Sequence, residues 1–222
     1  MKRILILLSL FLNIVLVSIF AYKIYHNWFE NTVLKLSFRT SIFNGAPKKD
    51  GLIYFVGDSH TEAFELNEYL NNSQVRNRGI WGDVTKIVLH RMDSIVTLKP
   101  SKIFLLIGVN DILSGVSVEK TYDNMTKIVE KIKDKSPSTI IYIQSVLPTD
   151  NKIFHSNSSA TAAVISLNKK YRLLDDHKKV RFINLYPAFE ENGVLKKELS
   201  FDGLHLTGKG YVLWSSLLKP YL

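Results

Sequence analysis

The sequence predicts an α/β fold of the flavodoxin-like, three-layer α/β/α type, with a five-stranded parallel sheet preceded by an N-terminal transmembrane helix. Three observations support this prediction. Short apolar runs rich in β-formers alternate with longer segments of helical spacing, which favours a parallel sheet with helices on both faces. The chain has 222 residues, of which 46% are hydrophobic, enough for one domain with a sizeable core. Its first residues form an apolar run long enough to approach the thickness of a bilayer.

The N-terminal run extends from Ile4 to Tyr22, follows Met1-Lys2-Arg3 and has few polar members. A helix rises about 1.5 Å per residue, so this run comes close to crossing a hydrocarbon core of about 30 Å. A cleaved signal peptide has the same basic start, but its apolar core is shorter, and the end of this run is a poor cleavage site. We therefore predict a retained anchor, with the body of the protein on the periplasmic or extracellular side.

Composition shifts along the chain predict three parts. Residues 1–22 are the membrane anchor or an uncleaved signal, and residues 23–47 are a juxtamembrane linker that mixes aromatic and polar residues. A cluster of glycine and proline before Lys48 marks a turn, and residues 48–222 form the globular domain.

Charge and cysteine content exclude several classes of function. The formal net charge is +9 at pH 7, but the lysines are scattered and form no basic stripe, so no nucleic-acid partner is expected. The chain has no cysteine, which rules out disulfides and thiolate catalysis. His155 lies in a serine-rich loop and the other isolated histidines lack partners at ligand spacing, so neither a metal nor a cofactor is expected.

Five runs of apolar, β-branched and aromatic residues are the predicted strands. They are Leu52–Val56, Val75–Asn77, Ile103–Ile107, Ile140–Val146 and Arg181–Leu185. Between and after them, apolar residues recur at helical spacing. These predicted helices cover residues 84–95, 122–132, 159–174 and 210–222.

The first strand ends abruptly in Gly57-Asp58-Ser59, where the sequence turns polar. This pattern is typical of a buried strand that delivers a serine to the start of a helix, and ligands of open parallel sheets bind beyond the carboxyl ends of strands. A nucleophile would lie there. Taken alone, however, Ser59-His60-Thr61-Glu62 also fits a capping box, in which the serine and the glutamate satisfy helix-end amides and perform no chemistry.

Three further segments place polar residues directly after strands or before a helix. They are Asn77–Asp83, Gly108-Val109-Asn110-Asp111 and Asp202-Gly203-Leu204-His205, the last followed by Thr207 as a helix cap. Each has a structural explanation as a turn, a cap or a surface loop. Because the junctions of one parallel sheet meet at one edge, the four segments are expected to converge.

Acyl transfer from an ester requires such a set of groups. The hydroxyl of Ser59 is a weak nucleophile and needs a base, for which His205 is the candidate, held in one tautomer by Asp202 three residues earlier. The oxyanion of the tetrahedral intermediate needs fixed donors. The amides of Ser59 and Gly82 and the side-chain NH2 of Asn110 can supply three.

In this order, the blocks resemble those of the SGNH hydrolases, a branch of the GDSL-type esterases. The matching motifs are Gly57-Asp58-Ser59, Gly82-Asp83, Gly108-x-Asn110-Asp111 and Asp202-x-x-His205. The resemblance covers about Leu52 to Leu222. It implies a serine esterase with Ser59 as nucleophile, His205 as base and Asp202 as its orienting carboxylate. It also implies an oxyanion hole formed by Ser59, Gly82 and Asn110.

Two positions depart from the family pattern. His60 stands where the name GDSL expects leucine, and we expect it to have at most a minor role. Trp81 precedes the oxyanion glycine, where a small residue is common, and it would narrow the acyl pocket in favour of a short acyl group. The aspartates 58, 83 and 111 are expected to hold the loops by accepting backbone N–H bonds.

Together these features predict a membrane-anchored serine esterase that hydrolyses short acyl esters, with O-acetyl groups on a carbohydrate as the expected substrate. The predicted partners are a small acylated substrate, glycan or lipid, and the membrane through the N-terminal helix. A lysophospholipase or thioesterase acting on lipids, and a glycan O-acyltransferase, are the alternatives within the same chemistry. A tethered binding module that has lost turnover is the alternative outside it, and labelling by a serine-reactive phosphonate would distinguish it.

Overall fold

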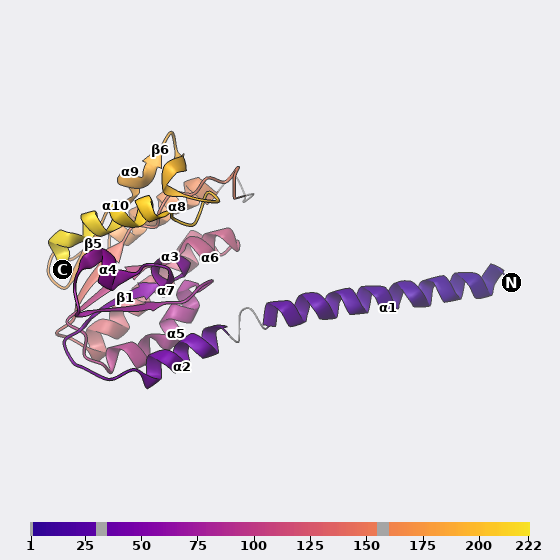
Figure 1. Cartoon of the computed structure of the whole chain (residues 1–222), viewed down its shortest axis with the longest axis horizontal. Coiled ribbons are helices and arrows are strands. Elements are labelled where there is room, and N and C mark those ends of the chain that lie inside the picture. The colour runs from indigo at the N-terminus through magenta and orange to yellow at the C-terminus, as the bar shows by residue number, and fades with distance from the viewer. Residues whose placement is uncertain (1, 30–34, 155–159) are drawn as a thin grey trace. The chain divides into compact units, whose positions relative to one another are not determined.

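The computed structural model describes residues 2–29, 35–154 and 160–222, and its α/β architecture confirms the predicted fold class (Figure 1). The five strands of the main sheet are β1 Ile53–Gly57, β2 Val75–Gly79, β3 Lys102–Leu106, β4 Ile140–Gln144 and β5 Val180–Ile183. All neighbouring strands are parallel, in the order β2-β1-β3-β4-β5. The order reverses between β1 and β3, and such switch points are where doubly wound sheets bind ligands.

Both faces of the sheet are buried because successive side chains of each strand point to opposite faces. Tyr54 and Val56 of β1 belong to one hydrophobic cluster, whereas Ile53 and Phe55 belong to the other. The first cluster includes residues of the long helices α5 Thr85–Val96, α7 Val118–Lys135 and α8 Ala160–Arg172. The second includes residues of α4 Leu66–Leu70 and α10 Gly208–Leu218. The three-layer arrangement is therefore the predicted one.

Short elements complete the domain. They are α3 Ser59–Glu62, α6 Val109–Leu113, α9 Tyr186–Phe189, the hairpin β6 Glu190–Glu191 and β7 Val194–Leu195, and the 3-10 turns Lys197–Leu199 and Lys219–Tyr221. The last helix starts at Gly208, and Thr207 is its cap as predicted, accepting a bond from the Gly210 amide at 3.4 Å. Strand β4 ends before Val146, whose amide instead donates to the Asn168 side chain at 2.8 Å.

Side chains close the outer edge of the sheet at β5. The amide of Val180 donates to Asp176 at 2.8 Å, and the amide of Phe182 donates to Asp175 at 2.9 Å. An edge strand with free amides is a template for pairing with another chain. These two carboxylates block that pairing.

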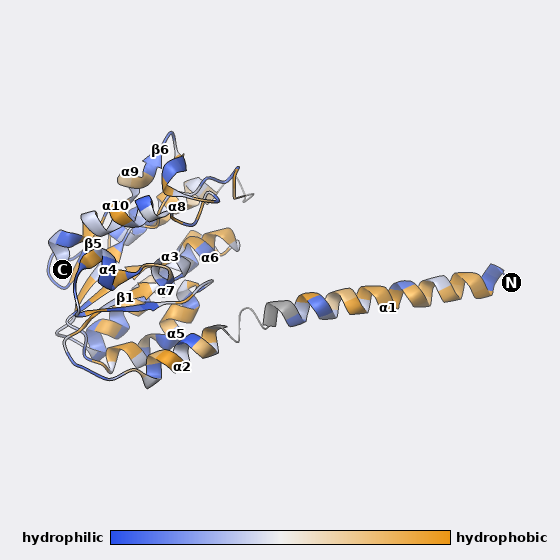
Figure 2. Ribbon diagram, in the orientation of Figure 1, coloured by the Kyte–Doolittle hydropathy of each residue, from blue (hydrophilic) through white to orange (hydrophobic). Residues whose placement is uncertain are grey.

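The chain divides into two compact units, Met1–Gly45 and Ala46–Leu222. The first contains α1 Lys2–Phe29, which runs beyond the predicted end at residue 22, and α2 Lys35–Gly45. Figure 2 shows that α1 is mostly hydrophobic, with hydrophilic residues at its start and at a few points along it, and its segment Lys2–His26 is long and apolar enough to cross a membrane. A signal sequence near the N-terminus would have the same length and composition. The domain limits at residues 22 and 47 stay predictions.

Candidate active site

Ser59 lies at the carboxyl end of β1, as the first residue of α3, and only 3% of it is exposed. The cap of α3 is Asp58, whose carboxylate accepts a bond from the His60 amide at 3.0 Å. The carboxylate of Glu62 accepts a bond from the Trp81 amide. The capping-box explanation of Ser59 is therefore wrong, since the neighbouring aspartate performs that task.

Two glycines hold the start of α3 close against the sheet. A Cβ on Gly57 would lie 2.2 Å from the carbonyl oxygen of Leu106, and a Cβ on Gly79 would lie 2.2 Å from the amide nitrogen of Glu62. Real Cβ atoms essentially never approach backbone this closely. The helix of Ser59 thus packs directly on the backbone of β2.

Two of the predicted oxyanion donors follow β2 and β3, the strands on either side of β1. Gly82 lies in the loop after β2, with a φ of +79° that favours glycine, and Asn110 lies in α6 after β3. The NH2 group of Asn110 donates to the carbonyl of Asp83 at 2.9 Å, which joins the two loops. Within the described residues, the amides of Ser59 and Gly82 donate to no protein acceptor.

His205 and Asp202 form the hydrogen-bonded pair that the sequence predicts. The Nδ1 atom of His205 lies 2.7 Å from Oδ2 of Asp202, whose other oxygen accepts the amides of Leu204 at 3.0 Å and His205 at 2.7 Å. Burial raises the pKa of Asp202, but the bonds from His205 and Leu204 outweigh burial and lower it overall. The carboxylate stays charged, so it can orient the imidazole at neutral pH.

Polar contacts fix the loop that carries this pair. The hydroxyl of Ser200 accepts the Gly203 amide at 2.9 Å and donates to the His205 carbonyl at 2.9 Å. The carbonyl of Gly203 accepts the amide of Asp150 at 2.7 Å. The backbone at Gly203 has a φ of +82°, and a Cβ there would lie 2.6 Å from the Asp150 carbonyl oxygen, so this turn requires glycine.

The imidazole of His205 is enclosed by other rings. Trp81 stacks on it with centroids 4.5 Å apart and planes 20° apart, and Phe154 meets it edge-on at 6.4 Å. Among the described residues no hydrogen bond joins Ser59 and His205. Their segments are joined one residue away, where Nε2 of His60 lies 2.9 Å from the Leu204 carbonyl oxygen. Catalytic hydrogen bonds are often long until substrate binds.

The three supporting aspartates do not all act as predicted. Asp58 and Asp111 accept backbone amides, the latter from Thr85 at 2.9 Å. Asp83 instead pairs with the side chain of Arg91, at 2.8 Å from Nε and 2.7 Å from Nη2. Burial raises the pKa of Asp83 to about 6, although Arg91 opposes that shift. Arg91 also donates to the Gly57 carbonyl at 3.2 Å, next to the nucleophile's loop.

Reasoning from sequence missed Arg91, Thr85 and Asn124. A signal for Arg91 was present, since it lies on the buried stripe of α5 that includes Val88 and Met92. A charged residue in an apolar stripe needs a buried partner. Thr85 and Asn124 left no such signal, because their role depends on contacts between α5, α6 and α7.

We predict that Thr85→Val destabilises the domain by about 2 kcal/mol, because it leaves buried polar groups without partners. The hydroxyl of Thr85 donates to Asp111 at 2.5 Å and accepts from Asn124 at 2.9 Å. Urea unfolding of the full chain measures the change. The matched control is Thr97→Val, because Thr97 is exposed and lies at the C-terminal end of the same helix. This variant should change the free energy of unfolding by less than about 0.5 kcal/mol. Equal stability of the two variants would contradict the assignment.

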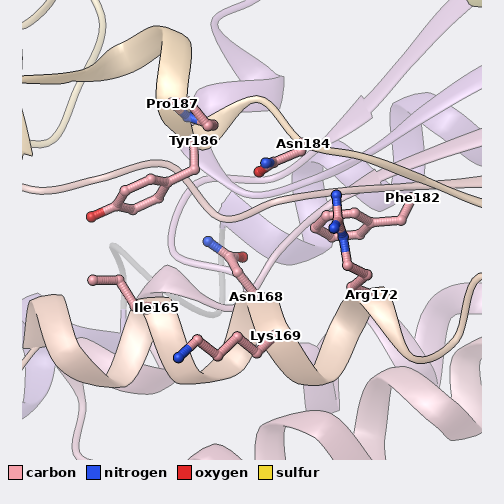
Figure 3. Close-up of a pocket in the computed structure, with 8 residues that line it drawn as sticks. All are labelled: Ile165, Asn168, Lys169, Arg172, Phe182, Asn184, Tyr186 and Pro187. Carbon is pink, nitrogen blue, oxygen red and sulfur yellow. The ribbon is translucent and has the colours of Figure 1, made fainter.

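The structure also has a pocket of about 310 Å³ between α8 and the segment that contains β5 and the start of α9 (Figure 3). Its lining residues are Ile165, Asn168, Lys169, Arg172, Phe182, Asn184, Tyr186 and Pro187. No predicted site residue is among them. The loop that contains His155 lies outside the described residues, so the prediction for that histidine stays untested.

A parallel sheet with a serine after its first strand, and an Asp–His pair in a loop docked beside that serine, matches the arrangement of serine-dependent acyl hydrolases. The chain belongs to the GDSL-like lipase/acylhydrolase family, whose model matches residues 55–213. The predicted family is thereby confirmed, and with it the class of this domain, an ester-cleaving hydrolase.

Solved structures and curated proteins agree with this membership. A structure described as a platelet activating factor from Streptococcus pneumonia has a TM-score of 0.77 and 30% identity, covering 91% of this chain and 98% of that one. A GDSL-like lipase from Bacteroides thetaiotaomicron shares the fold, with a TM-score of 0.73, 23% identity and coverage of 82% and 94%.

Two curated relatives are each 25% identical to this chain. The isoamyl acetate-hydrolyzing esterase of Saccharomyces cerevisiae is 25% identical over 80% of this chain and 79% of its own length. The N-acylneuraminate cytidylyltransferase of Streptococcus agalactiae serotype V is 25% identical over 87% of this chain, but the match spans only 43% of that protein.

Proposed function

We propose that this protein is a membrane-anchored serine esterase that removes short acyl groups, with O-acetyl groups on a carbohydrate as its substrates. The observation that carries the proposal is the Asp202–His205 pair, joined at 2.7 Å and docked against the residue that follows Ser59. We assign Ser59, His205 and Asp202 as the triad, and Ser59, Gly82 and Asn110 as the oxyanion hole.

The residues would act in two steps. The Ser59 oxygen attacks the ester carbonyl while its proton passes to Nε2 of His205, whose Nδ1–H stays bonded to Asp202. The amides of Ser59 and Gly82 and the Asn110 side chain stabilise the oxyanion. The alcohol leaves with the proton from His205, and the acyl group remains on Ser59. Water, deprotonated by His205, then releases the carboxylic acid and restores the serine.

Two similar proteins support a short acyl group and a sugar. The yeast relative is named for an acetate ester, and the streptococcal relative is named for an N-acylated sugar, although less than half of that protein matches this chain. Trp81 also supports a short acyl group, because its ring stacks on His205, the proposed base, and a ring there would take up space beside the reacting bond.

A lipid ester is the second candidate substrate, and one observation favours it. Apolar side chains near the Asp202–His205 loop are exposed: Phe201 is 78% exposed, Trp81 51% and Ile153 46%. As an anchor, the apolar helix α1 would tether the domain to a membrane, with the catalytic domain on the extracytoplasmic side. Glycan O-acyl transfer uses the same residues with a sugar hydroxyl in place of water.

Hydrolysis of p-nitrophenyl acetate, butyrate and octanoate, and of an acetylated sugar, by the full chain in detergent tests the proposal. We expect the acetate ester to have the highest kcat/KM among the aryl esters, and the sugar to be deacetylated. Trp81→Ala should raise the octanoate-to-acetate ratio of kcat/KM roughly tenfold, because it enlarges the acyl pocket.

Leu173→Ala is the matched control, since Leu173 is 76% exposed and precedes β5 at the opposite edge of the sheet. This control should leave the ratio unchanged. A wild-type preference for octanoate would favour the lipid substrate. Acyl transfer to an added glycan without hydrolysis would favour the transferase. Absence of turnover with any acceptor would favour the binding module.

A further inference from the structure

His60 follows the nucleophile directly and is buried, with only 2% of its surface exposed. Both of its ring nitrogens have partners: Nδ1 lies 3.2 Å from Oδ1 of Asp58, and Nε2 lies 2.9 Å from the Leu204 carbonyl oxygen. The two partners come from segments that are far apart in the sequence. Asp58 caps the helix of Ser59, and Leu204 precedes His205 in the loop of the base.

The chemistry of these partners determines the protonation of the ring. A carboxylate and a backbone carbonyl only accept hydrogen bonds, so both contacts are bonds only when both nitrogens carry a proton. Either neutral tautomer would leave a nitrogen lone pair facing an oxygen. The other carboxylate oxygen of Asp58 is buried and has no hydrogen-bond partner among the residues that the structure describes. A buried carboxylate in this state needs a nearby cation, which an imidazolium at residue 60 supplies.

We propose that His60 is a doubly protonated positioning residue that ties the helix of Ser59 to the loop of His205. The tie joins segments 144 residues apart. A third segment is joined through the same residue, because the Tyr211 hydroxyl of α10 donates to the His60 carbonyl at 3.0 Å. The proposal deepens the proposed function and rests on it, since it gives His60 a part in holding base and nucleophile in register.

We expect His60 to lose one of its two ring hydrogen bonds at alkaline pH. The groups that face His60 are Asp58, Asp202, Tyr211 and the ring of His205, which is 6.1 Å away. Burial lowers the pKa of His60, but the bond and charge of Asp58, the Leu204 carbonyl and the charge of Asp202 outweigh it and raise the pKa overall. Burial raises the pKa of Tyr211, so its hydroxyl stays a donor.

The direction of the His60 pKa shift determines how the stability of the fold changes with pH. A histidine whose pKa is higher in the folded than in the unfolded state stabilises the fold below the unfolded pKa, and this stabilisation is lost as the pH rises through the folded pKa. Loss of the second proton removes one of the two bonds. The base loop is then less well positioned, and kcat should fall on the alkaline side.

The test compares the full-length protein with His60→Leu, which carries the residue that the family name expects, and with His60→Gln, which keeps a donor for the Leu204 carbonyl. In p-nitrophenyl acetate hydrolysis we expect His60→Leu to lower kcat roughly tenfold, with KM changed less than about twofold, as for loss of positioning. His60→Gln should recover part of kcat. The alkaline fall of kcat should be absent in both, since neither side chain titrates.

His90→Leu, at an exposed histidine of α5, is the matched control and should keep the wild-type profile. An alkaline fall that persists in both His60 variants would overturn the proposal, as would an unchanged kcat in His60→Leu.

A second readout does not depend on catalysis. In ¹⁵N-labelled full-length protein, the ring of His60, assigned by its loss in His60→Leu, should show two N–H signals at neutral pH. A single N–H signal there would overturn the proposal whatever the activity. If both signals are present but Ser59→Ala keeps full activity, the esterase assignment fails while the tie between the segments stands.

Discussion

Ser59→Ala is expected to lower kcat for ester hydrolysis roughly 10⁴- to 10⁶-fold, because no other group can form the acyl-enzyme. The hydroxyl lies at the junction of β1 and α3, and Asp58 caps the helix in its place. Alanine at residue 59 therefore removes the nucleophile and no cap, so the free energy of unfolding should change by less than about 1 kcal/mol. Initial rates with p-nitrophenyl acetate and urea unfolding measure the two quantities.

The same assay tests whether the triad acts as a unit. Asp202→Asn should lower kcat about 10⁴-fold, because the imidazole loses the partner that fixes its tautomer. Combined with Ser59→Ala, it should cost nothing further, since residues that act together are not additive. Ser216→Ala, at an exposed serine on α10 whose hydroxyl donates to the Leu213 carbonyl, is the control. A Ser59→Ala variant that keeps a tenth of the activity would contradict the assignment.

Gly79→Ala should have the largest effect on stability, a loss of about 3 to 5 kcal/mol. The added Cβ would lie 2.2 Å from the Glu62 amide nitrogen and 2.6 Å from the Thr61 carbonyl carbon. Both atoms are backbone and cannot rotate away, so α3 or the end of β2 would have to shift. Because α3 begins with Ser59, we also expect the remaining folded protein to lose activity. Urea unfolding measures the change in stability.

Gly208→Ala is the matched control for this substitution. A Cβ there would meet only the Tyr69 hydroxyl, at 3.7 Å, which is an ordinary contact. Gly208 opens α10, where alanine is a better helix former, so stability should stay the same or rise by up to about 1 kcal/mol. Equal stability of Gly79→Ala and wild type would show that α3 does not pack on the backbone of β2 as described.

Local signals in the sequence were enough to predict the layers and the motif-bearing loops. The apolar runs around Phe55 and Leu105 are strands because both faces of a parallel sheet are buried, and that leaves a continuous hydrophobic pattern. The spacing of Asp202 and His205 predicted their pairing, because three residues are enough for a turn to aim one side chain at the other. The serine after β1 was predicted on the same local grounds.

Only the tertiary structure decided which polar groups meet across those loops. The contacts of His60 with Leu204, of Asp83 with Arg91 and of Trp81 with His205 join segments that no short spacing relates. The cap of α3 was also ambiguous in the sequence, since Asp58 and Ser59 are both good capping residues. The physical reason is the same in each case: a strand or helix follows from its own residues, whereas a buried polar partner depends on how distant segments pack.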